Sequence, residues 1–151
     1  MKSPLYALCL LSALLPARAL ALSCMVSVAT PVSFGTYEVT SPTDLDTAGE
    51  ILIHCKGVAE ADTITVDLST GSSGTYTPRE LAGGGDVLEY NLYLDSMYTI
   101  VWGDGSGVTE CYGPAKPEDG DTTLYVFGRV PAGQAVAAGS YDDTIVVTVN
   151  F

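Results

Sequence analysis

The segment Ser140-Tyr-Asp-Asp-Thr-Ile-Val-Val-Thr-Val-Asn-Phe151, which closes the sequence, decides the fold class. Its apolar residues alternate, so Ile145, Val147, Val149 and Phe151 share one face of a predicted strand. No residue follows Phe151 to turn the chain away from a neighbouring sheet. A sheet that ends on such a strand has an exposed edge, and exposed edges are normally covered. The sequence therefore predicts a partner for this edge.

Similar apolar and β-branched runs recur along the chain, separated by segments rich in Gly, Pro, Asp and Ser. No segment keeps a helical period over three turns, and the best helical candidate, residues 79–82, is one turn at most. The pattern predicts an all-β sandwich. The predicted strands are residues 24–29, 32–34, 50–55, 63–68, 87–94, 98–102, 123–130 and 141–151.

Alternation within these runs also predicts which side chains face the core. In each run one set of apolar residues alternates with residues that point the other way. The predicted core set is Ile51, Ile53, Cys55, Ile64, Val66, Leu68, Leu88, Tyr90, Leu92 and Leu94.

Residues 1–21 have the parts of a secretory signal. Lys2 lies near the start, an apolar run covers residues 5–15, and Ala19-Leu-Ala21 is a small-x-small cleavage site. Cleavage after Ala19 and cleavage after Ala21 both fit this pattern. The apolar run is too short for a membrane-spanning helix, which needs about 20 residues. Residues 22–151 are then one exported domain with no integral membrane segment.

The exported part of the chain is strongly acidic. It holds four cations against all 18 carboxylates, which is a formal net charge of −14. Such a charge repels phosphate backbones and anionic lipid surfaces, so nucleic acid is not an expected partner. An acidic exterior also keeps an exported protein soluble.

Three cysteines remain after the signal is removed. Cys24 and Cys55 each lie in an alternating apolar run, which is compatible with a bridge between the first two strands. Cys111 is then the odd cysteine. It is a buried inert thiol, a site for an intermolecular bridge, or a partner in a different pairing.

The sequence offers little catalytic chemistry, and we expect neither an enzyme nor a cofactor. His54, the single histidine, points away from the Cys55 side of its strand and is expected at the surface. Residues 103–107 and 118–121 lack the ligand spacing of a calcium loop, so hairpin turns are expected there and no metal site. The aromatic residues of segment 98–102 are expected to close the core rather than to form an adhesive patch.

Several segments together resemble the spore coat protein U domain, which is also the pilin domain of archaic, Csu-type chaperone-usher pili. Their order, spacing and terminal aromatic residue carry the resemblance. The segments are Val32-Ser-Phe-Gly-Thr-Tyr37, Gly49-Glu-Ile-Leu-Ile-His-Cys55, Leu88-Glu-Tyr-Asn-Leu-Tyr-Leu-Asp95, Trp102-Gly-Asp-Gly105, Val126-Phe-Gly-Arg-Val-Pro-Ala-Gly-Gln134 and Gly139-Ser-Tyr-Asp-Asp-Thr-Ile-Val-Val-Thr-Val-Asn-Phe151.

The resemblance implies an incomplete immunoglobulin-like sandwich that lacks one strand. A strand of a periplasmic chaperone fills the resulting groove, and the N-terminal segment of a neighbouring pilus subunit replaces it at the outer-membrane usher. The implied destination is the cell surface or the extracellular space. The resemblance also implies a Cys24–Cys55 disulfide. The residues expected to line the groove are Val26, Val28, Ile145, Val147, Val149 and Phe151.

One departure from the family pattern concerns the residues before Cys24. A donor segment needs about 9 to 11 extended residues to span a groove of about 30 Å. Only Leu22 and Ser23 precede Cys24 after cleavage at Ala21. The expectation is a subunit that accepts a strand but gives none, most simply at the tip of a fibre. The alternative is a secreted spore-coat or matrix protein of the same fold that does not polymerise.

Overall fold

A computed structural model describes residues 21–151, and the predicted secretory signal lies outside these residues except for Ala21. The described chain contains eight strands and one short 3-10 helix. They are β1 (Ser23–Thr30), β2 (Leu45–Lys56), β3 (Ile64–Leu68), η1 (Gly71–Ser73), β4 (Arg79–Gly83), β5 (Asp86–Tyr93), β6 (Tyr112–Ala115), β7 (Gly120–Val130) and β8 (Val147–Asn150).

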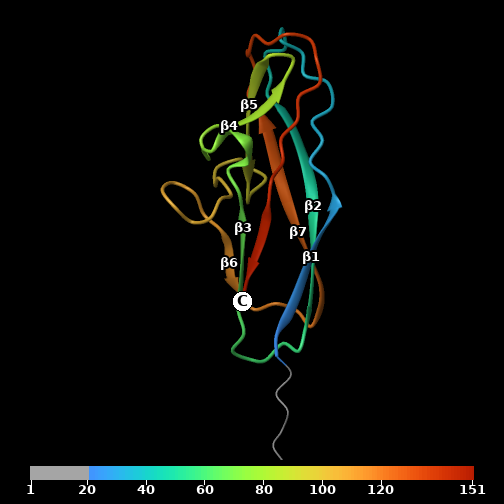
Figure 1. Cartoon of the computed structure of the whole chain (residues 1–151), viewed down its shortest axis with the longest axis vertical. Coiled ribbons are helices and arrows are strands. Elements are labelled where there is room, and N and C mark those ends of the chain that lie inside the picture. The colour runs from blue at the N-terminus through green and yellow to red at the C-terminus, as the bar shows by residue number, and fades with distance from the viewer. Residues whose placement is uncertain (1–20) are drawn as a thin grey trace, which may run out of the picture.

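The strands form two antiparallel sheets (Figure 1). The larger sheet has the order β1-β2-β7-β5-β4, and the smaller has the order β6-β3-β8. Long strands β2 and β7 pair over eleven positions and form the centre of the larger sheet. β1 and β8 are both edge strands, and they approach each other across the two sheets. The all-β sandwich predicted from the sequence is confirmed.

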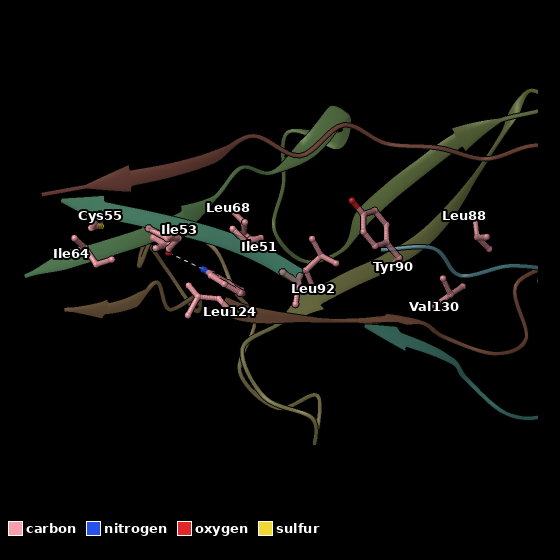
Figure 2. Close-up of a cluster of buried hydrophobic side chains, with 13 residues drawn as sticks. Ile51, Ile53, Cys55, Ile64, Leu68, Leu88, Tyr90, Leu92, Leu124 and Val130 are labelled. Carbon is pink, nitrogen blue, oxygen red and sulfur yellow. Dashed lines mark hydrogen bonds between the residues drawn. The ribbon is translucent and has the colours of Figure 1, made fainter. Parts of the chain in front are cut away.

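The core lies between the sheets, and the alternation predicted most of it (Figure 2). Nine of the ten predicted core residues are buried, and the tenth, Leu94, is partly buried against them. Strand pairing explains why the predicted core faces of different strands lie on one side of a sheet, because residues directly opposite each other point to the same side. Ile51, for example, lies opposite Leu124, and both belong to the core.

Trp102 and Arg79 are fully buried and tie the two sheets together. The Trp102 indole Nε1 donates a hydrogen bond of 2.8 Å to the carbonyl of Val66 in β3. The Arg79 guanidinium donates to the carbonyls of Ser69 and Trp102 and to the amide oxygen of Asn91, at 2.7–3.0 Å. The expectation that the aromatic residues of segment 98–102 close the core holds for Trp102.

Residues 79–82 belong to strand β4, so the interpretation of this segment as the best helical candidate was wrong. β4 pairs with β5 through a hairpin in which Gly84 and Gly85 both have positive φ. Positive φ at both central positions is the backbone of a tight hairpin turn, which glycine adopts without strain. Residues 79–83 have little alternation of their own, and pairing with β5 makes them a strand.

Two predicted strands are not strands in the structure. Within residues 98–102, only Val101 and Trp102 form isolated bridges. The Asp95 carboxylate accepts hydrogen bonds from the backbone of Met97, Thr99 and Ile100, which closes the preceding residues into a loop. Residues 32–34 also lack a strand partner. The predicted run 141–151 forms a strand ladder only at β8, together with an isolated bridge at Asp142.

Candidate functional site

The core-facing side of β1 is uncovered. Val26 lies opposite Ile53 and Val28 lies opposite Ile51, so each pair points to the same face of the sheet. Ile53 and Ile51 are 0% and 3% exposed, whereas Val26 and Val28 are 38% and 61% exposed. The facing layer therefore covers β2 but stops short of β1.

β8 has the corresponding feature on the smaller sheet. It pairs with β3 along one edge, which places Val147 opposite Leu68 and Val149 opposite Val66. Leu68 and Val66 are buried, whereas the two valines of β8 are only partly buried. Among the strands of residues 21–151, none pairs with the other edge of β8. Two uncovered edges with apolar inner faces therefore meet at this side of the sandwich.

A groove of about 1050 Å³ opens at this side. Its lining includes core side chains of both sheets, namely Ile51, Leu68, Leu88, Tyr90, Leu92 and Val126. Residues 30–40 line one part of it and residues 136–143 another, and we call these two segments its walls. Val28, Ile145 and Val147 also line the groove.

Three of the six predicted groove residues therefore line this cavity. Val26 lies next to the groove on β1, and Val149 lies on β8 beyond Val147. Phe151 follows β8 and is 63% exposed. These three lie outside the lining of the cavity, although Val26 and Val149 belong to the strands that border it and Phe151 directly follows β8.

Backbone groups of the walls are unpaired over most of their length, and Figure 1 draws both segments as coil. Within the described part of the chain, residues 31–37 and 132–141 make no backbone–backbone hydrogen bond. The contacts that hold them come from side chains, such as the Tyr37 hydroxyl, which bonds to the Pro131 carbonyl and the Gln134 amide. Unpaired N–H and C=O groups along an extended segment are what an added strand requires.

The wall at residues 30–40 packs against the larger sheet where two glycines leave room. A Cβ on Gly49 would lie 2.9 Å from a Val32 methyl group, and a Cβ on Gly128 would lie 2.9 Å from the Phe34 ring. Phe34 also makes an edge contact with Tyr90 at 5.8 Å between ring centroids. Sequence reasoning did not predict this wall as part of the site. The signal for it is that the apolar residues Val32 and Phe34 lie two positions apart, and both are partly buried in the structure.

The wall at residues 136–143 is anchored by Asp143. Its carboxylate accepts hydrogen bonds from the Tyr90 hydroxyl at 2.7 Å and from the backbone N–H groups of Ser72 and Thr144 at 2.8 Å. Burial, followed by the hydrogen bond to Asp143, raises the pKa of Tyr90 far above its usual range. Burial lowers the pKa of the nearby Arg79. The hydrogen bonds of Asp143 fix this wall to β5 and to η1.

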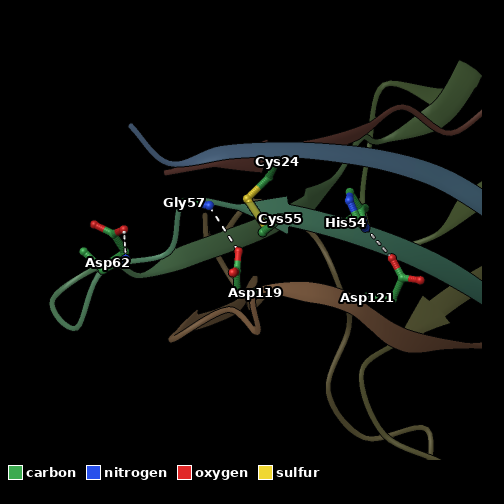
Figure 3. The surroundings of a disulfide bond; sticks show 8 residues. Cys24, His54, Cys55, Gly57, Asp62, Asp119 and Asp121 are labelled. Atoms are coloured by element: carbon green, nitrogen blue, oxygen red, sulfur yellow. Dashed lines mark hydrogen bonds and ion pairs between the residues drawn. A yellow bond between two sulfur atoms is a disulfide. The ribbon is translucent and has the colours of Figure 1, made fainter. Parts of the chain in front are cut away.

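A disulfide joins Cys24 of β1 to Cys55 of β2, with 4.1 Å between the Cα atoms (Figure 3). The two residues lie directly opposite each other, so the bond ties the first strand to the larger sheet.

Cys111 is free and partly exposed. His54 lies on the opposite face of β2 from Cys55, and its Nδ1 lies 2.5 Å from Asp121 Oδ1 at the surface.

Residues 21–151 show no group of three or more His, Cys, Asp or Glu side chains placed to hold a metal ion. The Asp104 carboxylate, in one of the loops considered for calcium, accepts a hydrogen bond from the Ser106 backbone. No helix within these residues reaches the length and apolarity needed to cross a membrane.

Comparisons with known proteins agree with this architecture. A family model of the Spore Coat Protein U domain matches residues 11–148. Protein U of Myxococcus xanthus is 33% identical over 132 residues, which cover 80% of this chain and 71% of that protein.

One solved structure is similar in fold. It is the crystal structure of the CsuC-CsuE chaperone–tip adhesion subunit pre-assembly complex from archaic chaperone-usher Csu pili of Acinetobacter baumannii. The match has a TM-score of 0.58 and 22% sequence identity, and it covers 87% of this chain but only 40% of the matched chain. It supports the incomplete immunoglobulin-like sandwich as the fold. The chain belongs to the Spore Coat Protein U domain family.

Proposed function

We propose that this chain is an exported structural or adhesive subunit of an archaic chaperone-usher pilus, and that its groove accepts a β-strand from a partner. The partners are a periplasmic chaperone, the outer-membrane usher and neighbouring pilus subunits. The observation that carries the proposal is the pairing of the exposed Val26 and Val28 with the buried Ile53 and Ile51. The sandwich has a place for one more strand in its facing layer.

A strand laid in the groove would satisfy two needs at once. Its backbone would pair with the unpaired N–H and C=O groups of the walls, and its alternate side chains would cover the apolar lining. Complete burial of a valine or isoleucine side chain is worth about 1.5–3 kcal/mol. Several side chains on each partner would be buried together, which favours a long-lived complex.

The family to which the chain belongs and its similarity in fold to a solved structure also support this proposal. The similar solved structure is a complex between a chaperone and a tip adhesion subunit, and the likeness covers most of the present chain. A place at the tip of a fibre stays a prediction from the sequence. A secreted coat protein is the second candidate, because sequence identity to Protein U is 33%, against 22% to the chain in the pilus complex.

Donor-strand uptake can be tested with one variant and one matched control. V28D places a charge on the inner face of β1, and S27D places the same charge on the outer face one residue earlier. We expect V28D to lose co-purification with a matching chaperone and S27D to keep it. Both residues are exposed in the free chain, so neither change should unfold it.

The two candidate functions predict different behaviour of the unmodified protein. A pilus subunit should be poorly soluble or oligomeric alone and become monomeric with a chaperone or an alternating ten-residue peptide. A coat protein should be a stable monomer that binds neither the chaperone nor the peptide. Equal chaperone capture of V28D and S27D would contradict the proposed site.

A further inference from the structure

We propose that the strand filling the groove is basic: an edge strand of the chaperone that carries Lys or Arg on its outward face, rather than a segment of a second copy of this chain. This inference rests on the proposed function and adds the chemistry of the occupant. It follows from the direction of side chains along the walls and from the distribution of charge.

Burial alternates along part of each wall, as in paired strands, and the exposed Glu38 follows the partly buried Tyr37. On one wall Val32 and Phe34 are partly buried, whereas Ser33 and Gly35 between and after them are exposed. On the other wall Tyr141 and Asp143 are partly buried and Asp142 between them is exposed, and the same alternation continues beyond the wall at the exposed Thr144 and Val146. A strand laid between the walls would therefore place its outward side chains beside the exposed residues of both.

The charged side chains available there are all negative. The described residues that line the groove include four carboxylates and no Lys, Arg or His. Asp143 is engaged by Tyr90 and Ser72, and Glu50 accepts a hydrogen bond from Thr30. The carboxylates of Glu38 and Asp142 are exposed and have no ion pair or hydrogen bond within residues 21–151.

Cations elsewhere in the described chain do not offset this charge. Arg79 is fully buried. Lys116 forms an ion pair with Glu60, and Arg129 forms one with Asp46. Lys56 lies at the far end of β2, six positions and about 20 Å from Glu50. A second copy of this chain would be repelled by the same field that attracts a basic partner.

The experiment uses three fluorescent ten-residue peptides with the same inward row of Val and Ile. Their outward residues are all Thr in the neutral peptide, with Lys replacing two Thr in the basic peptide and Glu replacing the same two in the acidic one. Dissociation constants are measured by fluorescence anisotropy on the full chain, expressed for export so that the disulfide forms. Measurements at about 20 mM and about 300 mM salt separate electrostatic from apolar contributions.

We expect the basic peptide to bind best and the acidic peptide worst, with about a tenfold difference in Kd at low salt, because two opposite-charge cross-strand pairs replace two like-charge pairs. High salt should narrow the difference. The double variant E38Q/D142N should abolish most of the preference of the groove for the basic peptide over the acidic one.

Two results would overturn this inference, and they differ from failure of the proposed function. Equal binding of the three peptides means that charge does not select the occupant, although the groove still takes a strand. Preference for the acidic peptide points to another copy of this acidic chain as occupant. Failure of all three peptides to bind, the neutral one included, would contradict the groove as a strand acceptor and this inference with it.

Discussion

Val28 and Ile51 are register partners on the neighbouring strands β1 and β2, and their side chains point to the same face of the sheet. Val28 is nevertheless 61% exposed, whereas Ile51 is 3% exposed. The first belongs to the open half of the sandwich, where β1 and β8 form the edges of the groove. The second is buried where the groove meets the closed half, which is built around Trp102 and Arg79. The side chains are similar in kind, so the difference comes from whether a facing layer lies over them.

The two halves divide stability and binding between them. Within the described residues no buried side-chain nitrogen or oxygen lacks a hydrogen-bond partner, and the dense network around Arg79 belongs to the closed half. The walls of the open half have unpaired backbone instead. Changes in the closed half should therefore alter the free energy of unfolding with or without a partner, and changes in the groove should alter chiefly what the partner adds.

The largest effect is expected from R79M in the closed half. It removes the donors to Ser69, Asn91 and Trp102, and it leaves the carbonyl oxygens of Ser69 and Trp102 without a hydrogen-bond partner, while Asn91 Oδ1 keeps the bond from the Leu92 N–H; the change should cost about 3–5 kcal/mol of unfolding free energy. K116M is the matched control, because its exposed pair with Glu60 is worth at most about 1 kcal/mol. Urea unfolding measures both, and similar losses would erase the distinction between the two halves.

Removal of the disulfide tests how β1 is held to the closed half. The double variant C24S/C55S opens a loop of about 32 residues, which should cost about 3–4 kcal/mol on the chain-entropy model. Donor peptide should restore part of this loss, since the added strand also contacts β1. Full stability of the variant without peptide would show that strand pairing alone secures β1.

A strand bound in the groove should cover the apolar faces of the open half and so stabilise the folded chain. At 100 times its Kd, a neutral ten-residue donor peptide should raise the unfolding free energy by about 2.7 kcal/mol. The variant I145D should lose this gain, whereas V146D, on the outward side of the same segment, should keep it. Thermal unfolding with and without peptide measures the difference, and the same gain in both variants would place the strand elsewhere.

The smallest effect is expected at the boundary between the halves, where Tyr90 holds Asp143. Y90F should cost about 1–2 kcal/mol by removing one hydrogen bond to a carboxylate. Burial raises the pKa of Tyr90 above the ordinary value of about 10, so the folded chain keeps a proton that the unfolded chain releases.

The direction of the pH dependence follows from that shift. Stability due to Tyr90 is fully present below about pH 10 and is lost as the pH rises beyond it. Unfolding free energies measured from pH 8 to pH 11 should therefore fall, with a gentler slope in Y90F. A slope unchanged by Y90F would show that other groups control the alkaline loss.

Sequence reasoning found the fold class and most of the core because alternation records which residues face a buried layer. Ile51, Ile53 and Cys55 are all buried as predicted. It mistook residues 79–82, since a short strand paired through a Gly84-Gly85 turn carries no periodic signal of its own. Residues 98–100 read as a strand from their composition, but the Asp95 carboxylate turns them into a loop.

The groove was only partly visible in the sequence. Val28, Ile145 and Val147 were expected from alternation at the two ends of the chain and from the family resemblance, and they line the cavity. The wall around Phe34 was not expected as part of the site, because its place depends on the space above Gly49 and Gly128. That space exists only when β2 and β7 are paired.

The sequence by itself determined the class of fold, the inner and outer faces of most strands and the acidic character of the chain, because these depend on local alternation and composition. Tertiary structure decided which apolar faces stay uncovered. Val26 and Ile53 have the same local pattern, and only the reach of the facing sheet makes one exposed and the other buried. Exposure of a strand face depends on contacts between residues far apart in the sequence, and no local pattern encodes where those contacts end.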